Sequence, residues 1–209
     1  MEASTVPRFP TDQVRTDFLS VFIYLTHNAI RRILLSPEYA ATALKVNIMM
    51  NNADIDQIQK VLESMLQYEL NLSDFYSQCA DTWKNDKAFW QTLAHAETKH
   101  AENVHKIREM ITQKQDRFEL GRPFNTTALN TAMSGLKENA KRLASGSVPR
   151  EKILIMARDI EQSVLESHYA EIVKTADIEY QTLMKGILSD TYQHKQIIQK
   201  KIDALAAKA

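Results

Sequence analysis

Apolar residues recur along this chain at spacings of three and four positions, which is the period of an amphipathic α-helix. The pattern is clearest after residue 50, where it predicts four long helices. We expect them over about residues 54–83, 86–113, 149–176 and 177–206. The first should begin after Asn-Asn-Ala-Asp at residues 51–54, because these residue types cap helices well.

The remaining segments connect or precede these four predicted helices. Residues 115–150 are less regular, hold a short helical pattern over about 127–143, and are long enough to cross a bundle. A helix pair, a long crossover and a second pair favour an all-α, antiparallel four-helix bundle. A helical pattern at 11–35 and a weaker one at 39–50 predict an N-terminal helical extension. We therefore divide the chain into an extension, 1–50, and a bundle, 51–209.

Composition supports the helical interpretation and narrows the partners. Glycine and proline number only 4 and 5, too few for the turns of an all-β fold. Lys+Arg and Asp+Glu balance at 26 each, so we expect no nucleic-acid partner. No stretch reaches the roughly 18 uninterrupted apolar residues of a membrane span. A single cysteine, Cys79, excludes an internal disulfide framework and favours a cytoplasmic protein.

Charged and imidazole side chains interrupt the apolar stripes at a few places. Glu69 lies on the stripe of the first predicted bundle helix, and Glu97 and His100 lie on that of the second. Burying a charge is costly unless it is paired or bound to metal. Glu97 and His100, three residues apart, project from one helix face. Carboxylates and imidazole suit iron or manganese, so the pattern predicts a metal site.

The second helix pair carries a less complete version of this pattern. Glu161 and His194 occupy the matching stripes, but Thr191 stands three residues before His194, where a second Glu would complete a two-metal site. Asp190, four residues before His194, is a candidate replacement. Further candidates are Glu166 and His168. Alternatively, buried Glu and His satisfy each other by hydrogen bonding, without metal.

From residue 54 onward the chain resembles the ferritin-like superfamily, in its rubrerythrin-like branch. The likeness rests on Glu69 with Tyr76 seven residues later, on Leu-Ala leading into Glu-Thr-Lys-His-Ala at 97–101, on Gly-Arg-Pro-Phe-Asn at 121–125, and on Asp-Ile-Glu at 159–161. The resemblance implies a non-haem iron bundle, commonly a homodimer. In active members it implies iron oxidation or peroxide reduction.

The chain departs from this family in two respects. No pair of Cys-x-x-Cys motifs is present, so a rubredoxin-like electron-delivery domain is absent and the electron donor is unknown. Thr191 in place of a carboxylate leaves the second iron poorly held. We therefore predict metal ligands Glu69, Glu97, His100, Glu161, Asp190 and His194, for one or two ions of iron, with manganese or zinc as alternatives.

Three functions follow as hypotheses. The first is an iron-dependent oxidoreductase acting on dioxygen or peroxide, with Tyr76 fixing a ligand by hydrogen bond. The second is an iron-binding or sensing protein without turnover. The third is a metal-free interaction module in which the amphipathic segment 14–35 docks on a partner. Translation starting at Met49 or Met50 is a further hypothesis for residues 1–48, and intact-mass analysis of the native protein tests it.

Overall fold

The computed structural model describes residues 37–124 and 126–207, and over this part the protein is all-α, as expected. Contacts divide the chain after Met50, and Asn51–Ala209 is described here by itself. The α-helices are α2 (Pro37–Thr82), α3 (Lys87–Gln113), α4 (Thr126–Ala144), α5 (Arg150–Glu166) and α6 (Ile178–Ala206). Short 3-10 helices lie at η1 (Lys84–Asp86), η2 (Gln115–Arg117) and η3 (Tyr169–Glu171). The predicted helix at 11–35 falls outside the described residues.

The helix that carries Glu69 starts earlier than the sequence indicated. Helix α2 runs without interruption from Pro37 to Thr82, so the predicted helix start after residues 51–54 is wrong. Asn and Asp cap helices well, but inside a helix each costs only about 0.7 kcal/mol relative to alanine. Without a glycine or proline at 51–54, nothing forces the helix to end there.

The other helix boundaries agree with the sequence except at the end of α5. Helices α3, α4 and α6 lie close to their predicted ranges, and the Asp177 carboxylate caps α6 by accepting from the backbone N–H groups of Glu179 and Tyr180. Helix α5 ends at Glu166, ten residues before the predicted end. His168 adopts the left-handed conformation, with φ of 58°, and the chain then turns into η3.

A two-stranded antiparallel pairing explains why the apolar pattern at 172–173 is not helical. Strand β2 (Val173–Lys174) pairs with β1 (Glu119–Leu120), with Leu120 opposite Val173. Gly121 continues the pairing, because its N–H donates to the Ile172 carbonyl at 2.9 Å. A Cβ at Gly121 would lie 2.3 Å from the Glu171 carbonyl oxygen, so only glycine allows this close approach.

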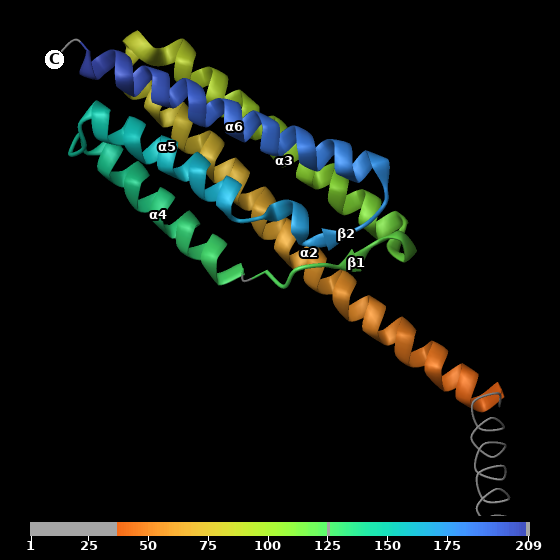
Figure 1. Ribbon diagram of the computed structural model, residues 1–209. Helices are drawn as coiled ribbons and strands as arrows, with labels where there is room; N and C mark the ends of the chain where they lie inside the picture. Colours follow the sequence, from red (N-terminus) through yellow and green to blue (C-terminus); the bar gives the residue numbers. More distant parts are fainter. Residues whose placement is uncertain (1–36, 125, 208–209) are drawn as a thin grey trace, which may run out of the picture. The chain divides into compact units, whose positions relative to one another are not determined.

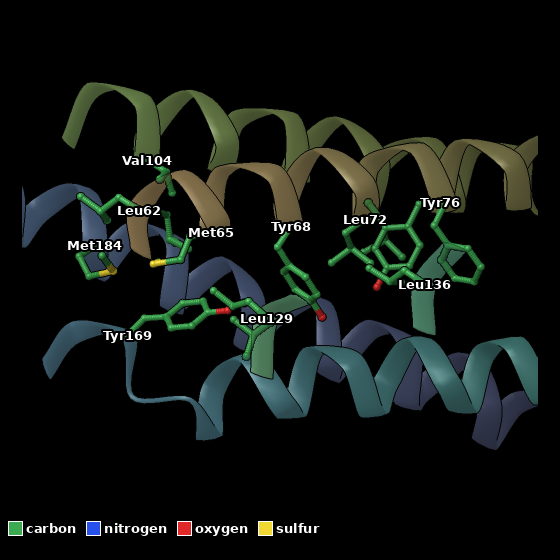
Figure 2. Packing of buried hydrophobic residues seen from close by; sticks show 14 of the residues in the cluster. Leu62, Met65, Tyr68, Leu72, Tyr76, Val104, Leu129, Leu136, Tyr169 and Met184 are labelled. Atoms are coloured by element: carbon green, nitrogen blue, oxygen red, sulfur yellow. The ribbon is translucent and has the colours of Figure 1, made fainter. Parts of the chain in front are cut away.

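The core of this unit lies between α2, α3, α5 and α6, which run side by side in Figure 1. Side-chain contacts tie α2 to α3 and to α5, and α3 to α6. Figure 2 shows Leu62, Met65 and Leu72 of α2 pointing into this interior. Helix α4 adds buried leucines spaced by seven residues, Leu129, Leu136 and Leu143. Among the described residues, no helix is long and apolar enough to cross a membrane.

Candidate metal centre

Five of the six predicted ligands meet inside the core, and each is held by the apolar stripe of its own helix. Glu69, Glu97, His100 and Glu161 are each 1% exposed, and His194 is 7% exposed. Their helical neighbours three and four residues away are buried apolar side chains, which turn the polar ones inward. These neighbours include Met65 and Leu72 on α2, Leu93 and Val104 on α3, Ala157 and Val164 on α5, and Ile198 on α6.

Glu97 stands between two histidines from different helices. Its Oε2 atom lies 2.9 Å from Nδ1 of His100, and its Oε1 atom lies 2.9 Å from Nδ1 of His194. Glu69 Oε2 is 3.9 Å from the same nitrogen of His100, and Glu161 Oε2 is 3.8 Å from that of His194. The two imidazole rings lie 5.5 Å apart, centroid to centroid.

The donor atoms fall into two groups, and the two groups share one carboxylate, that of Glu97. The first group is Glu69, Glu97 and His100, and the second is Glu97, Glu161 and His194. Within each group one donor atom per residue lies within 4.8 Å of the others, which is close enough to hold a metal ion. A carboxylate whose two oxygens face different histidines has the arrangement of a bridging ligand.

Burial and the charges of neighbouring side chains shift the pKa values of this cluster, upward for some carboxyl groups and downward for another. Burial, then the charge of Glu97, raises the pKa of Glu69 well above its usual value and also raises that of Glu161. Burial also raises the pKa of Glu97, but the interactions with His100 and His194 outweigh burial and lower this pKa to about 2. Burial alone lowers the pKa of His194, yet Glu161 and Glu97 raise it to about 10. In the metal-free cluster these shifts favour an ionised Glu97 beside a protonated His194, and they favour protons on Glu69 and Glu161.

Several polar atoms of the cluster have no hydrogen-bond partner within the described part of the chain. Oε1 of Glu69 and Nε2 of His100 are two of them, whereas Oε1 of Glu97 and Nδ1 of His194 lie 2.9 Å apart as an ion pair without hydrogen-bond geometry. A buried polar atom without a partner costs about 1–3 kcal/mol. The site therefore holds donor atoms that the protein itself does not satisfy, and cations coordinated by the carboxylate and imidazole atoms would satisfy them.

Asp190 and Thr191 take different positions from the five central residues. Thr191 is buried, but its hydroxyl donates to the Ile187 carbonyl of its own helix at 2.9 Å. Asp190 is 55% exposed and belongs to neither donor group, and its Oδ2 lies 3.7 Å from Nε2 of His100. This nitrogen is the one that faces away from Glu97. Asp190 thus lies behind the His100 ring.

The two weaker candidates lie outside the cluster. Glu166 is exposed at the end of α5 and accepts a hydrogen bond from Gln162. His168 is exposed beyond that end, with Nδ1 3.0 Å from Glu171 Oε1. Glu166 comes five residues after Glu161, which is about 140° around the helix, so it faces away from the cluster. His168 lies beyond the end of α5, where the chain has already left the helix.

Tyrosines surround the acids, and the sequence indicated only one of them. Tyr76 donates to Glu161 Oε1 at 2.6 Å, as a ligand-fixing residue should. Tyr68 and Tyr169 are also buried, and the pKa of each is raised by burial and then by the charge of Glu69. The sequence did not indicate Tyr68, because a residue adjacent to Glu69 is expected about 100° away from it around the helix. Tyr169 was expected inside a continuous helix.

Comparison with protein-family models, curated proteins and solved structures found no match for this chain. Function is therefore inferred from the site itself. Its donor set, three carboxylates and two imidazoles buried on four helices, is chemically a set of metal ligands.

Proposed function

We propose that residues 51–209 form a ferritin-like four-helix bundle, of the rubrerythrin-like branch, that binds a pair of iron ions between its helices. Glu69, Glu97 and His100 would hold one ion, and Glu97, Glu161 and His194 the other. The observation that carries this proposal is the position of Glu97, whose two oxygens each lie 2.9 Å from a different buried histidine. A purely structural pair needs only one such contact.

The chemistry of the donors supports iron. Mixed carboxylate and imidazole ligation suits iron and manganese, whereas structural zinc sites are mostly built from cysteine and histidine. Three protein donors at each position leave coordination sites for oxygen ligands. Bound non-haem iron supplies one-electron chemistry toward dioxygen or peroxide.

Two residues behind the ligands support the same interpretation. Tyr76 holds the Glu161 carboxylate through a short hydrogen bond at Oε1, which leaves Oε2 facing His194. Asp190 lies behind His100, where its carboxylate, 3.7 Å from Nε2, favours the tautomer with the proton on Nε2 and leaves the Nδ1 lone pair for a metal. We infer that Asp190 is a positioning residue and not the replacement ligand.

One observation favours a second candidate function, iron binding or sensing without turnover. Thr191 contributes no charge to the cluster and bonds its own backbone. Because Glu97 is shared, the missing carboxylate weakens both ion positions and not one alone. Three carboxylates then balance less charge than a divalent pair carries. Such a site holds ions but lacks the second carboxylate bridge that oxidised iron pairs commonly have.

Elemental analysis of the iron-reconstituted protein tests the proposal. We expect about two iron ions per chain, as in di-iron carboxylate bundles. Glu97→Gln should bind almost none, because both positions lose a ligand. Glu102→Gln is the matched control: it makes the same change on the same helix, at an exposed residue with no ion pair among the described residues. Wild-type iron content in Glu97→Gln contradicts the proposal. Peroxide consumption by the iron-loaded protein then distinguishes the two candidate functions: turnover supports the oxidoreductase, and its absence supports iron binding without turnover.

A further inference from the structure

A series of aromatic rings runs from the metal centre to the surface where α2 leads into η1. It begins at Tyr76, whose hydroxyl donates to Glu161 Oε1 at 2.6 Å. The ring of Tyr76 lies beside that of Trp90, with centroids 5.7 Å apart, and Trp90 lies beside Trp83, with centroids 6.2 Å apart. Trp83 is half-buried at the surface. The series therefore joins a proposed iron ligand to the outside of the protein.

The composition of this series differs from that of the other ring contacts. Away from the metal centre, the ring contacts of the described residues are the single pairs Phe118 with Tyr180 and Phe124 with Tyr169. The series, in contrast, contains both tryptophans of the chain. Tryptophan and tyrosine give up a single electron far more readily than phenylalanine does. Every ring between the cluster and the surface can therefore take part in electron transfer.

The middle ring of the series carries a polar atom that the fold does not satisfy. Trp90 is fully buried, and its indole N–H has no hydrogen-bond partner in the part of the chain that the structure describes. A buried N–H group without a partner costs about 1–3 kcal/mol, and a buried tryptophan usually finds one. A phenylalanine would fill most of the same space without this cost, so packing alone does not explain a tryptophan here. Because the N–H has no acceptor, Trp90 can lose and regain an electron while it keeps its proton.

We propose that Trp83 and Trp90 carry single electrons from a small one-electron reductant in solution, such as ascorbate, to the iron pair, an inference that rests on the function proposed above. Trp90 gives one electron to the metal cluster across the Tyr76 ring, Trp83 gives one to Trp90, and the reductant restores Trp83. Each ring ends as it began, and the reductant is oxidised by one electron. Two such transfers, with two protons from solvent, reduce one hydrogen peroxide to two waters.

The spacing of the rings makes Trp90 the step that the path requires. Among the ring contacts of the described residues, Trp83 reaches Trp90 but not Tyr76. Electron tunnelling weakens exponentially with distance, so two short transfers between neighbouring rings are faster than one long transfer over the same span. Phe89 also lies beside Trp90, with centroids 5.0 Å apart, but its ring is hard to oxidise. Replacing Phe89 therefore changes the packing around Trp90 without removing an electron carrier.

Peptide mass spectrometry of the full-length, iron(II)-loaded protein after exposure to hydrogen peroxide tests the path without an activity assay. When no reductant is present, the missing electron stays on Trp83, which then takes up oxygen from water or dioxygen. We expect Trp83 to be oxidised well ahead of Tyr192, which is 54% exposed but lies outside the series. Ascorbate should protect Trp83. Trp90→Phe should lose most of the Trp83 oxidation at unchanged iron content, whereas the matched control Phe89→Leu should keep it.

A second variant keeps the test informative if Trp90→Phe fails to fold. Trp83→Phe changes only a half-buried ring, and it leaves Trp90 as the last oxidisable ring of the path. Electron paramagnetic resonance of samples frozen shortly after peroxide is added should show a tryptophan radical in both proteins. Ascorbate should remove this radical in wild type but not in Trp83→Phe, because the buried ring of Trp90 is out of its reach.

The outcomes separate this path from the iron site itself. Wild-type Trp83 oxidation in Trp90→Phe, or an equal loss in Phe89→Leu, overturns the path. Equal oxidation of Tyr192 and Trp83 indicates radicals in solution and overturns it as well, as does a radical that ascorbate removes equally in wild type and Trp83→Phe. A protein that binds no iron contradicts the proposed function and this path together, whereas any of these results in an iron-loaded protein contradicts the path alone.

Discussion

Thr191→Glu places a fourth carboxylate opposite Glu97 and shows whether the site is built for a metal pair. Thr191 lies on the buried face of α6, three residues before His194, so a longer side chain there points into the cluster. The substitution removes one local hydrogen bond, from the Thr191 hydroxyl to the Ile187 carbonyl. It adds a carboxyl group beside Glu69 and Glu161, which already have raised pKa values.

The substitution should destabilise the metal-free protein, and tighter metal binding should offset this cost in the loaded protein. In the metal-free protein the new carboxyl must take up a proton, and the lost hydrogen bond adds to the penalty. We expect a cost of about 2–3 kcal/mol in the free energy of unfolding. With metal, a fourth carboxylate balances the charge of a divalent pair. We expect binding to tighten by about tenfold to a hundredfold, so the metal-dependent part of the stability should rise by about 1.4–2.8 kcal/mol and offset most of that cost.

Cobalt(II) titration followed by visible absorption measures the affinity, and urea unfolding with and without metal measures the two stabilities. Thr182→Glu is the control. Thr182 lies on the same helix and donates to the Ile178 carbonyl at 2.8 Å, but it is exposed and outside the cluster. It should change neither metal affinity nor the metal-dependent part of stability. The reasoning is refuted if Thr191→Glu binds cobalt no more tightly than wild type does. It is also refuted if the variant loses the same free energy of unfolding with and without metal.

Two further predictions concern side chains around the site and at the end of the unit. Asp190→Asn should lower cobalt affinity about tenfold to a hundredfold with the fold intact, because it removes the carboxylate behind His100; unchanged affinity would show that Asp190 does not position the ring. Burial raises the pKa of Asp86, but Arg150 and Lys201 outweigh it and lower that pKa below its usual value. Because the folded pKa lies below the unfolded one, near 3.9, Asp86 stabilises the fold above that value and loses this contribution as pH falls through the folded pKa. Urea unfolding between pH 6 and pH 2.5 should therefore show a smaller acid-induced loss of stability in Asp86→Asn than in wild type, and parallel curves would contradict this.

The sequence by itself determined the helical class and most of the polar interior. Spacing along one helix is a local property, so the stripes of α3 and α6 predicted those helices closely. The same spacing placed Glu69, Glu97, His100, Glu161 and His194 on inward faces, and all five are buried. An acid or histidine on an apolar stripe is readable from the chain alone, because burial of that stripe buries the polar side chain with it.

Only the tertiary structure decided how these side chains meet. The sharing of Glu97 between two histidines depends on the rotation of α3 against α6, which no single stripe records. One residue is about 100° of helix rotation, so packing alone placed Thr191 inside and Asp190 behind His100. The end of α5 likewise depends on the pairing of β2 with β1, more than fifty residues away in the chain. Helical periodicity is local, whereas donor geometry and strand pairing are contacts between distant segments, and these exist only after the helices have packed.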